Sequence, residues 1–539
     1  MPAKKGKLDT ANFRAIGLKP LFAKLYDFIL LKRLMRWFKI PVEQTAYQKG
    51  KGCYMHVFFV RTLIAVAVKQ KKSIYIGISD FAAAFDSISR RLLLQKLVCF
   101  GIGAFMLNAL KEMYKESCVF IEMNGEYSQE FNLTAGVLQG ASTSTILFIA
   151  YTADLITLFK NVFKEEDLIH LFHILVHADD ALILATKKSI LINKFLVLEA
   201  YCNENMIKQQ PKKCSFLCIN SNEKETIHLK NGEISYNNIT VYLGSTISDR
   251  GNINYDIKQE IKGKEKAFNK YFIFMHKNYN APLTVKLKVL NAFLVSSILY
   301  NCETWGNVNT HDLEKQYCYA LKYILGVRNQ CCNEFPYIEL GMPTLNSIIQ
   351  SRQYKFYTNI IQNRDWPMLR YIVNQGRTSK CNFIAHYDKL MNTIDDGEAI
   401  KSNSLIKIRE DVIRKAGEGR SRYVKYLEIN PTLTKPNHIY DNYVQTTKLQ
   451  KLTRIRTSCH SLAIELGRHT RTRKSKEMRL CHCNEMEDEN HFVLKCHSYD
   501  NIRQRYIGNM PEIRLSDVLQ MDFAPDFVQE LEKQREIYN

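Results

Sequence analysis

The sequence of 539 residues predicts an α+β protein made of several units. Between residues 71 and 250, short β-like runs alternate with helical stretches, which is the pattern of a mixed domain. From about residue 251 to 480 the pattern is long, basic and helical, and the last part holds a compact group of cysteines and histidines. Because a domain takes roughly 100–200 residues, we expect about three or four units.

The composition excludes wholesale disorder and favours a polyanionic partner. Hydrophobic residues make up 46% of the chain and aromatic residues 11%, which is enough for large cores. Lys and Arg number 75 against 54 Asp and Glu, so the net charge is +21. The excess is spread over both halves of the chain. This indicates a basic body rather than a basic tail, and it leaves the chemistry open.

Neither a membrane anchor nor secretion is predicted. The uncharged run from Phe131 to Ala153 contains Asn132, Gln139 and a Ser/Thr block at 142–145, so we expect no membrane helix there. The chain opens without an apolar signal segment, and its 15 cysteines are scattered as in proteins with reduced thiols. We therefore expect an intracellular protein of nucleus and cytoplasm, with no membrane partner.

The first predicted elements are helices within residues 1–70. Apolar residues recur there at helical spacing, at Leu21, Leu25, Phe28 and Met35. The Gly/Lys stretch 49–52 then predicts a loop.

Two acidic residues interrupt a pair of apolar runs in the mixed domain. Asp179 and Asp180 stand between residues 174–176 and 181–184, which predicts a hairpin with carboxylates at its tip. An ordinary turn is the alternative interpretation, because Asp is favoured in turns.

A third carboxylate ends another β-like run and favours a functional site over an ordinary turn. Residues 73–80 end in Asp80, and residues 81–92 are helix-like. If the two strands are neighbours, Asp80, Asp179 and Asp180 converge at one sheet edge. Clustered carboxylates need a cation to stay ionised together, and hard oxygen ligands favour Mg²⁺ or Mn²⁺ over zinc. Two such ions suit in-line phosphoryl transfer, so we expect the basic chain to act on nucleic acid.

An ordered series of motifs resembles a known family. Residues 80–86, 136–140 and 178–180 are similar to successive palm motifs of reverse transcriptases, in the order and spacing of non-LTR (LINE-type) retrotransposon polymerases. Other segments extend the resemblance over nearly the whole chain: 12–14 and 44–53 for the fingers, 211–214 and 242–244 for the later palm motif and primer grip, and 300–305 and 325–327 for the thumb and beyond.

The resemblance implies a right-hand polymerase with fingers, palm and thumb and a mostly helical C-terminal extension. It implies an RNA-directed DNA polymerase that extends a DNA primer, or nicked target DNA, on an RNA template with dNTPs. The chain would be the C-terminal part of a polyprotein, without the endonuclease domain. The implied domains are fingers and palm at 1–250, a helical thumb and post-thumb region at 251–400, a basic helical linker at 401–475, and a zinc-knuckle-like segment with the C-terminal tail at 476–539.

The family motifs imply roles for the residues of the polymerase site. Asp80 and Asp179 would be the main ligands of Mg²⁺ (or Mn²⁺), and Asp180 would complete the acidic site. Phe85 falls where the family keeps an aromatic steric gate against a 2′-hydroxyl; the alternative is a core aromatic at a helix start.

Other positions would touch the substrates. Gln139 and Gly140 match the motif that contacts the nascent base pair, and their alternative is an ordinary turn. Lys213 matches a lysine suggested to protonate pyrophosphate. Arg14, Lys49 and Lys51 would bind triphosphate or template phosphate from the fingers. For the four cations, solvated surface charge is the alternative.

Departures from the family pattern keep a second hypothesis open. His177 stands where an aromatic residue is usual, and Ser144-Thr145 where Ser-Pro is usual. Gln48, Cys53 and Cys214 also replace expected residues. The rival hypothesis is a degenerate or domesticated copy that binds nucleic acid without polymerising. A group II intron-type maturase is a further alternative, which the C-terminal Cys/His segment speaks against.

A Cys/His group near the C-terminus predicts a zinc site. Cys481, Cys483, His491 and Cys496 have the residue types of a Cys₃His site, for which metal would supply the folding energy. Unrelated reduced thiols are the alternative. The flanking sequence resembles the C-terminal segment of the same retrotransposon proteins, although its first pair is shorter than Cys-x-x-Cys and leaves His482 as a substitute ligand.

A basic stretch precedes this group. We expect its cations to contact nucleic-acid phosphates, or else to form a solvated helix face; they are Arg454, Arg456, Arg468, Arg471, Arg473 and Lys474.

Overall fold

The computed structural model describes most of the chain in two compact units. It describes residues 17–82, 85–115, 118–123, 125–164, 172–363, 365–394, 396–437, 444–468, 473–508 and 512–538. The N-terminal unit comprises residues 1–257, 303–307 and 357–388, and the C-terminal unit comprises 258–302, 308–356 and 389–539. The units therefore cut across the ranges expected from the sequence, because 303–307 and 357–388 pack with the first 257 residues.

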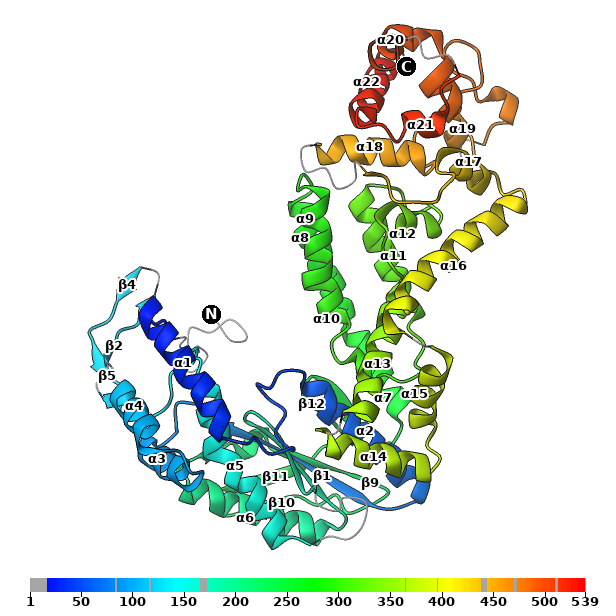
Figure 1. Ribbon diagram of the computed structural model, residues 1–539. Helices are drawn as coiled ribbons and strands as arrows, with labels where there is room; N and C mark the ends of the chain where they lie inside the picture. The colour runs from blue at the N-terminus through cyan, green and yellow to red at the C-terminus, as the bar shows by residue number, and fades with distance from the viewer. Residues whose placement is uncertain are drawn as a thin grey trace. The chain divides into compact units, whose positions relative to one another are not determined.

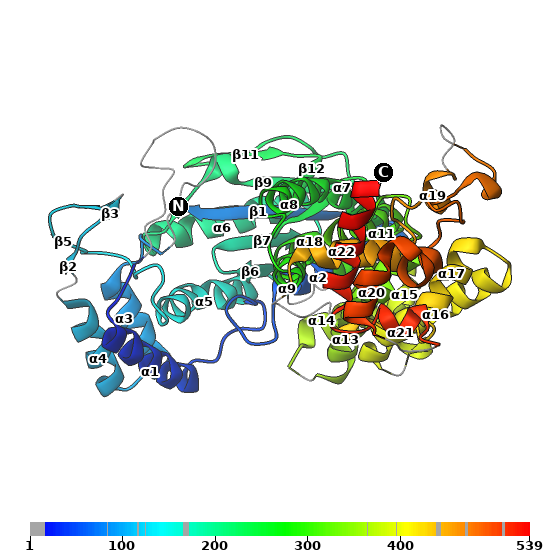
Figure 2. The ribbon, with the colours of Figure 1, turned by 90° about the horizontal axis from the view of Figure 1, so that it is seen from above.

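A mostly antiparallel sheet of seven strands forms the centre of the N-terminal unit. Its order is β10-β11-β9-β1-β7-β6, and β8 pairs with the end of β1. Figure 2 shows the run from β11 through β9, β1 and β7 to β6. The strands are β1 Ile74–Ala82, β6 Ile174–His177, β7 Asp180–Ala185, β8 Lys208–Gln209, β9 Ser215–Ile219, β10 Ile227–Leu229 and β11 Gly232–Tyr236. The expected strands at 74–78, 174–176 and 181–184 are confirmed, and so is the α+β class.

Helices complete the core of this unit. They are α1 Leu21–Trp37, α2 Cys53–Gln70, α3 Arg90–Cys99, α4 Ala104–Lys115, α5 Ser144–Val162, α6 Lys188–Glu204 and α14 Pro367–Thr378. Helix α6 lies against β1 and β7, with α5 beside it (Figure 1). Gly77 in β1 permits this close packing, because a Cβ there would lie 2.5 Å from the ring of Phe195 in α6. Between α1 and α2, the chain passes along the end of the sheet that carries Asp80 and Asp179.

Two helices of this unit are long and apolar enough to cross a membrane by length and composition alone. In α2 and α5, 67% and 61% of the apolar window is buried inside the protein. Core helices of globular proteins pass the same test, so the two helices are weak evidence for a membrane span.

Helix α1 confirms the helix expected near the start of the chain, and the apolar face whose spacing predicted it is turned to solvent. The residues on that face are all exposed: Leu21, Leu25, Phe28 and Met35. The buried residues are Asp27, Leu30 and Leu34 instead. The reason is that Asp27 binds the N-terminal end of α5, which turns the opposite side of α1 to solvent.

The helix expected at 81–92 begins later than predicted. Strand β1 continues to Ala82 because its end pairs with β8, Phe81 opposite Gln209 and Ala82 opposite Lys208. Helix α3 begins only at Arg90, where the Ser89 hydroxyl accepts a hydrogen bond from the Leu92 N–H at 3.4 Å.

Small hairpins lie at the edges of the unit. They are β2 Cys118–Val119 with β5 Phe131–Asn132, β3 Glu122–Met123 with β4 Glu126–Tyr127, and β12 Ile239–Tyr242 with β13 Ser245–Ser248. The β12–β13 turn contains Leu243 and Gly244, both with positive φ, which is the geometry of a tight type I′ hairpin turn.

The C-terminal unit is helical. Its helices are α8 Glu265–Lys277, α9 Leu283–Val289, α10 Ser296–Ile298, α11 His311–Leu325, α12 Glu334–Leu340, α16 Gly397–Gly417, α17 Ser421–Ile429, α18 Thr446–Arg456, α19 Ala463–Leu466, α20 Asp500–Tyr506, α21 Leu515–Val518 and α22 Ala524–Tyr538. Three helices run across the division between the units: α7 Ile253–Gly263, α13 Leu345–Gln362 and α15 Asn382–Thr393.

A buried ion pair joins α12 to α18 in this unit. Arg456 and Glu339 have side chains 1% and 0% exposed, and their Nε–Oε2 and Nη2–Oε1 distances are 2.9 and 3.0 Å. The Tyr426 hydroxyl donates to the same carboxylate at 2.8 Å. The expectation that Arg456 contacts nucleic-acid phosphate was therefore wrong, because the guanidinium is already buried and paired.

Breaking this pair should strongly destabilise the C-terminal unit. We expect Glu339→Gln to lower its free energy of unfolding by about 3–5 kcal/mol, because an uncompensated buried guanidinium remains. Urea unfolding followed by far-ultraviolet circular dichroism, with amide hydrogen exchange in α12 and α18 to assign the change to this unit, measures the loss. The matched control is Asp411→Asn, which breaks the more exposed pairs of this carboxylate with Arg414 and Lys415 and should cost about 0–1 kcal/mol. Equal losses in both variants would contradict the expectation.

Candidate active site and metal centre

Three carboxylates meet at one end of the central sheet. Strands β1 and β7 are antiparallel neighbours, and their register places Asp80 opposite Asp180. Strands β6 and β7 form a hairpin, with His177 opposite Asp180 and the turn at Ala178 and Asp179. We call this hairpin, residues 174–185, the aspartate hairpin. The expected hairpin and the expected neighbouring strands are both confirmed.

The electrostatics of this cluster show crowding of negative charge. Burial, together with the charges of the neighbouring Asp179 and Asp80, raises the pKa of Asp180 to about 6, and Lys213 opposes this shift. A divalent cation would relieve this repulsion, so the donor set fits a hard metal ion.

Lys213 reaches this cluster from the strand edge. Its Nζ lies 2.9 Å from Oδ2 of Asp80, and its side chain is 62% exposed. The short 3₁₀ turn Pro211–Lys213 follows β8, which pairs with the end of β1. The Gln210 N–H also donates to the Asp80 carbonyl at 3.2 Å. The lysine is thus held beside a carboxylate and keeps access to solvent.

Phe85 packs against the core of the N-terminal unit. Its side chain is half-buried, and its ring stacks on Phe148 of α5 with centroids 5.1 Å apart and planes 22° apart. One face of the ring thus packs on the core, as the alternative interpretation expects, and the role of sugar gate stays a prediction.

The loop that carries Gln139 and Gly140 is pinned to the segment after Asp80. A Cβ on Gly136 would lie 2.8 Å from the Asp86 carbonyl oxygen, and Gly136 has φ +78°, so glycine is required there. The Gln139 amide donates to the Asp86 carboxylate at 3.2 Å. Gly140 is exposed and has φ +99°.

Asp27 supports this loop from α1, and sequence reasoning missed it. Its carboxylate accepts hydrogen bonds from the Ser142 N–H at 2.5 Å and from the Thr143 hydroxyl at 2.5 Å. The carboxylate thus satisfies free N–H groups near the start of α5 and interacts with the positive end of the helix dipole. The available signal was a lone acidic residue inside an otherwise apolar stretch of α1.

The three basic residues expected to bind phosphate from the fingers do not share one environment. Lys49 is exposed and Lys51 is half-buried, on the loop between α1 and α2. Burial lowers the pKa of Lys51, and the charge of Asp365 opposes the shift. The same loop approaches the carboxylates, since burial and then the Asp179 charge raise the pKa of Tyr47. Arg14 lies outside the described residues.

The Cys/His residues form one compact cluster in the C-terminal unit. The ligand atoms of Cys481, Cys483, His491 and Cys496 all lie within 4.8 Å of one another. The Cys496 sulfur is 3.8 Å from that of Cys481 and 3.9 Å from that of Cys483, and the His491 Nε2 is 3.2 Å from the Cys483 sulfur. Two sulfurs bound tetrahedrally to one zinc ion at about 2.3 Å lie about 3.8 Å apart, so the cluster fits zinc.

His482 lies beside the cluster but is not one of the four grouped ligands. Its Nδ1 is 3.2 Å from the Cys481 sulfur, its Nε2 pairs with the Ser498 hydroxyl at 2.5 Å, and its ring stacks on Tyr538 with centroids 4.7 Å apart. In contrast, His491 presents its second nitrogen to the Glu485 carboxylate at 3.2 Å. A carboxylate in that place commonly orients a metal-binding imidazole.

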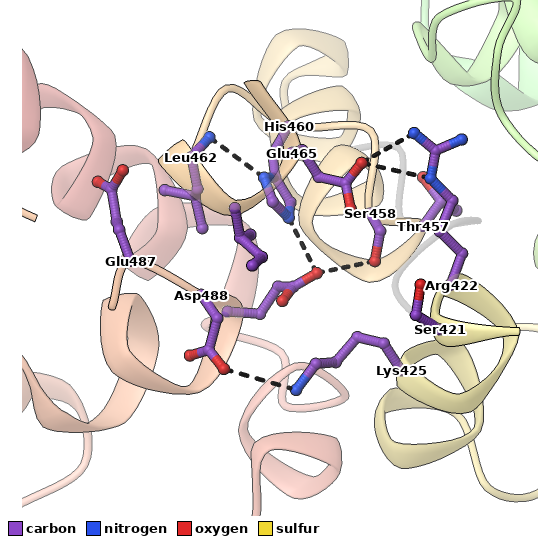
Figure 3. Close-up of polar contacts among 12 residues, drawn as sticks. Ser421, Arg422, Lys425, Thr457, Ser458, His460, Leu462, Glu465, Glu487 and Asp488 are labelled. Carbon is purple, nitrogen blue, oxygen red and sulfur yellow. Dashed lines mark hydrogen bonds and ion pairs between the residues drawn. The ribbon is translucent and has the colours of Figure 1, made fainter. Parts of the chain in front are cut away.

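The cluster does not depend on metal for its whole core. Cys481, Phe492, Val493 and Cys496 belong to a buried hydrophobic group that includes residues of α18 and α22. Polar contacts tie the same segment to the turn after α18: Glu489 accepts a hydrogen bond from the Ser458 hydroxyl at 2.7 Å and pairs with His460 at 3.0 Å. Figure 3 labels these two partners, Ser458 and His460, on that turn. We expected metal to supply the folding energy because a short segment could not build a core by itself. That reason was wrong, because the segment shares a core with α18 and α22.

Comparisons with known proteins agree with the geometry of the N-terminal unit. Residues 3–247 match the family model described as "Reverse transcriptase (RNA-dependent DNA polymerase)". The chain is 26% identical over 229 residues to a Pol polyprotein from the type-1 retrotransposable element R2 of Nasonia vitripennis, which covers 42% of this chain and 22% of the relative. A second R2 Pol polyprotein, from Bradysia coprophila, is 28% identical over 152 residues, or 28% of this chain and 17% of the relative. The matched part thus spans about a fifth of these relatives' length.

Among solved structures, the chain is similar to telomerase of Candida tropicalis in complex with a fragment of telomeric RNA. That match has a TM-score of 0.32 and 10% identity, and it covers 68% of this chain and 56% of that chain. A telomerase of Candida albicans gives a TM-score of 0.33 at 11% identity, covering 70% and 58%. Similarity at this level adds nothing to the family model.

Proposed function

We propose that this protein is an RNA-directed DNA polymerase of a non-LTR element. It matches the reverse transcriptase family model over residues 3–247, and R2 retrotransposon Pol polyproteins are among its sequence relatives. The observation that carries the proposal is the strand register. It brings Asp80 opposite Asp180 and next to the Asp179 turn, with Lys213 paired to Asp80.

The residues of this site suit nucleotidyl transfer. Asp80, Asp179 and Asp180 would hold two Mg²⁺ ions, which supply charge neutralisation for the attacking primer hydroxyl and the departing pyrophosphate. The exposed ammonium of Lys213 lies where it can place a proton or a positive charge on the pyrophosphate. Reverse transcriptases use divalent metal; the choice of Mg²⁺ over Mn²⁺ belongs to the proposal.

The proposed partners follow from this function and from the basic chain. They are an RNA template, a DNA primer or nicked target DNA, and dNTPs, with a net charge of +21 to attract the phosphates. We propose zinc as the ion of the Cys₃His cluster. The protein would act in the nucleus after synthesis in the cytoplasm, without a membrane partner.

Primer extension tests the proposed function directly. The full chain is incubated with a DNA primer annealed to an RNA template, dNTPs and Mg²⁺, and the products are resolved by length. We expect full-length complementary DNA that requires Mg²⁺ and the RNA template. Tight RNA binding with no product at any Mg²⁺ or Mn²⁺ concentration would instead support the rival hypothesis, a copy that binds nucleic acid without polymerising.

Phe85 should act as the sugar gate of this polymerase. We expect Phe85→Ala to raise the efficiency of rNTP over dNTP incorporation by about 10²-fold, because the ring no longer excludes the 2′-hydroxyl. The ratio of kcat/KM values for one rNTP and the matching dNTP measures it.

The control for this variant must reproduce the packing that Phe85 loses against Phe148. Phe163→Ala serves, since Phe163 is a half-buried ring that packs on Phe159 of the same helix with centroids 5.5 Å apart. An unchanged sugar ratio in Phe85→Ala, or an equal change in the control, would refute the role.

A further inference from the structure

A buried amide side chain holds the turn that carries Asp179. Gln44 is 1% exposed and lies on the loop between α1 and α2. Its Oε1 accepts two hydrogen bonds, from the Ala178 N–H at 3.1 Å and from the Ala46 N–H at 3.0 Å. One oxygen therefore links the loop to the residue immediately before Asp179.

The backbone of Ala178 needs such a partner. Its φ is +56°, in the left-handed region that is unfavourable for residues with a Cβ. Ala178 is also buried, so an unpaired N–H there would be costly. The amide of Gln44 satisfies that N–H only while the turn keeps this conformation, and the turn sets the direction of Asp179 and Asp180.

Residues 176 and 177 are tied to the same loop. The Val176 N–H donates to the Glu43 carbonyl at 2.9 Å, and the Thr45 N–H donates to the Val176 carbonyl at 3.2 Å. The imidazole of His177 pairs with the Thr45 hydroxyl at 2.9 Å and with the Cys53 thiol at 3.3 Å. Two departures from the family pattern, Cys53 and His177, are thus partners of each other.

Different contacts hold Asp80 and the turn that carries Asp179. Asp80 is fixed by the pairing of β1 with β7 and β8. Asp179 is at the turn, beyond the ladder, and Ala178 has Gln44 as its hydrogen-bond acceptor.

On the basis of the proposed polymerase function, we propose that Gln44 is a positioning residue for the metal-binding carboxylates: it locks Ala178 in the left-handed conformation and so aims Asp179 and Asp180 at the ions that Asp80 shares. Gln44 itself touches neither metal nor substrate. It acts through the aspartate hairpin.

The test removes the acceptor and keeps the volume. Gln44→Met should lower kcat of primer extension by about 10²-fold, the scale of a misplaced catalytic group. KM for dNTP should stay within about twofold, because nucleotide contacts remain. The Mg²⁺ concentration for half-maximal rate should rise about tenfold. The matched control is Gln70→Met in α2, whose amide donates to the Ser379 hydroxyl at 2.7 Å, and it should change none of these values.

A direct metal titration separates the inference from the proposed function. Mn²⁺ binding to the full chain is followed by loss of the free-ion signal in electron paramagnetic resonance, and we expect about tenfold weaker binding in Gln44→Met than in the wild type. If the wild type makes no DNA, the proposed polymerase fails, and the Mn²⁺ affinities alone still decide the role of Gln44. Equal Mn²⁺ affinity and equal Mg²⁺ dependence in the two proteins overturn the inference.

A second variant with a shorter side chain covers the case in which Gln44→Met does not fold. Should Gln44→Met lose its native circular dichroism, Gln44→Asn keeps an amide in the loop and withdraws the acceptor from Ala178. A purely structural role predicts a lowered melting temperature with unchanged metal dependence in the folded Gln44→Asn variant, and that result also overturns the inference.

Discussion

Replacement of Asp179 by asparagine is expected to abolish Mg²⁺-dependent primer extension, with kcat falling by about 10³-fold or more. The substitution keeps the size of the side chain and its hydrogen-bonding oxygen but removes the negative charge. It also removes one source of the raised pKa of Asp180, so that carboxyl should ionise more readily in the variant. Loss of activity together with an easier ionisation of Asp180 would separate metal binding from simple crowding.

The control for this experiment is an aspartate with no place in the site. Asp312 of α11 has a side chain that is 89% exposed, and Asp312→Asn should extend primers like the wild type. Primer extension with Asp179→Ala checks that the effect does not arise from the new amide. If Asp179→Asn and Asp179→Ala keep more than about a tenth of the wild-type rate, the acidic site assignment is incorrect.

Loss of the Cys₃His cluster should empty the second metal site and loosen its surroundings. We expect about one zinc ion per chain in the purified protein and none in Cys496→Ser, because a zinc site of this type needs all four ligands. The Cys496 sulfur lies close to two of the other ligands, so its removal opens the cluster.

The structural effect should be local but large. Amide hydrogen exchange should show protection lost over residues 480–499, whereas α18 and α22 keep theirs through the hydrophobic group that they share. The control is Cys99→Ser, an exposed thiol of α3 that should leave zinc content and protection unchanged. A wild-type chain that holds no zinc after purification without chelators would remove the assignment.

The acidic site could be predicted well from the sequence for a local reason. Each carboxylate lies within three residues of a short apolar run, as in 174–176 and 181–184 on either side of Asp179 and Asp180. Such runs have few alternatives in a mixed domain, and the pairing of β1 with β7 follows once both are central strands. The Cys₃His cluster could be predicted equally well, because four ligands within 16 residues are close in any compact fold.

Burial of charged groups was the least predictable feature. The periodicity of α1 correctly indicated a helix but did not show which face is buried, because Asp27 is a buried acceptor for the Ser142 N–H and the Thr143 hydroxyl. Arg456 was expected on a nucleic-acid surface, yet it is paired with Glu339, 117 residues away in the chain. In both cases a polar residue is buried because a partner distant in sequence satisfies it, and periodicity carries no information about that partner.

The sequence by itself determined the chemical groups of this protein: three carboxylates at strand ends, a Cys₃His set in a short segment, and the order of motifs that resembles a reverse transcriptase. Tertiary structure alone decided how those groups are held. Gln44 supports Ala178 from 134 residues away, and Lys213 pairs with Asp80 only because β8 joins the end of β1. The physical reason is that ligand types are fixed by local chemistry, whereas the direction of a side chain depends on hydrogen-bond partners that only the packed chain brings together.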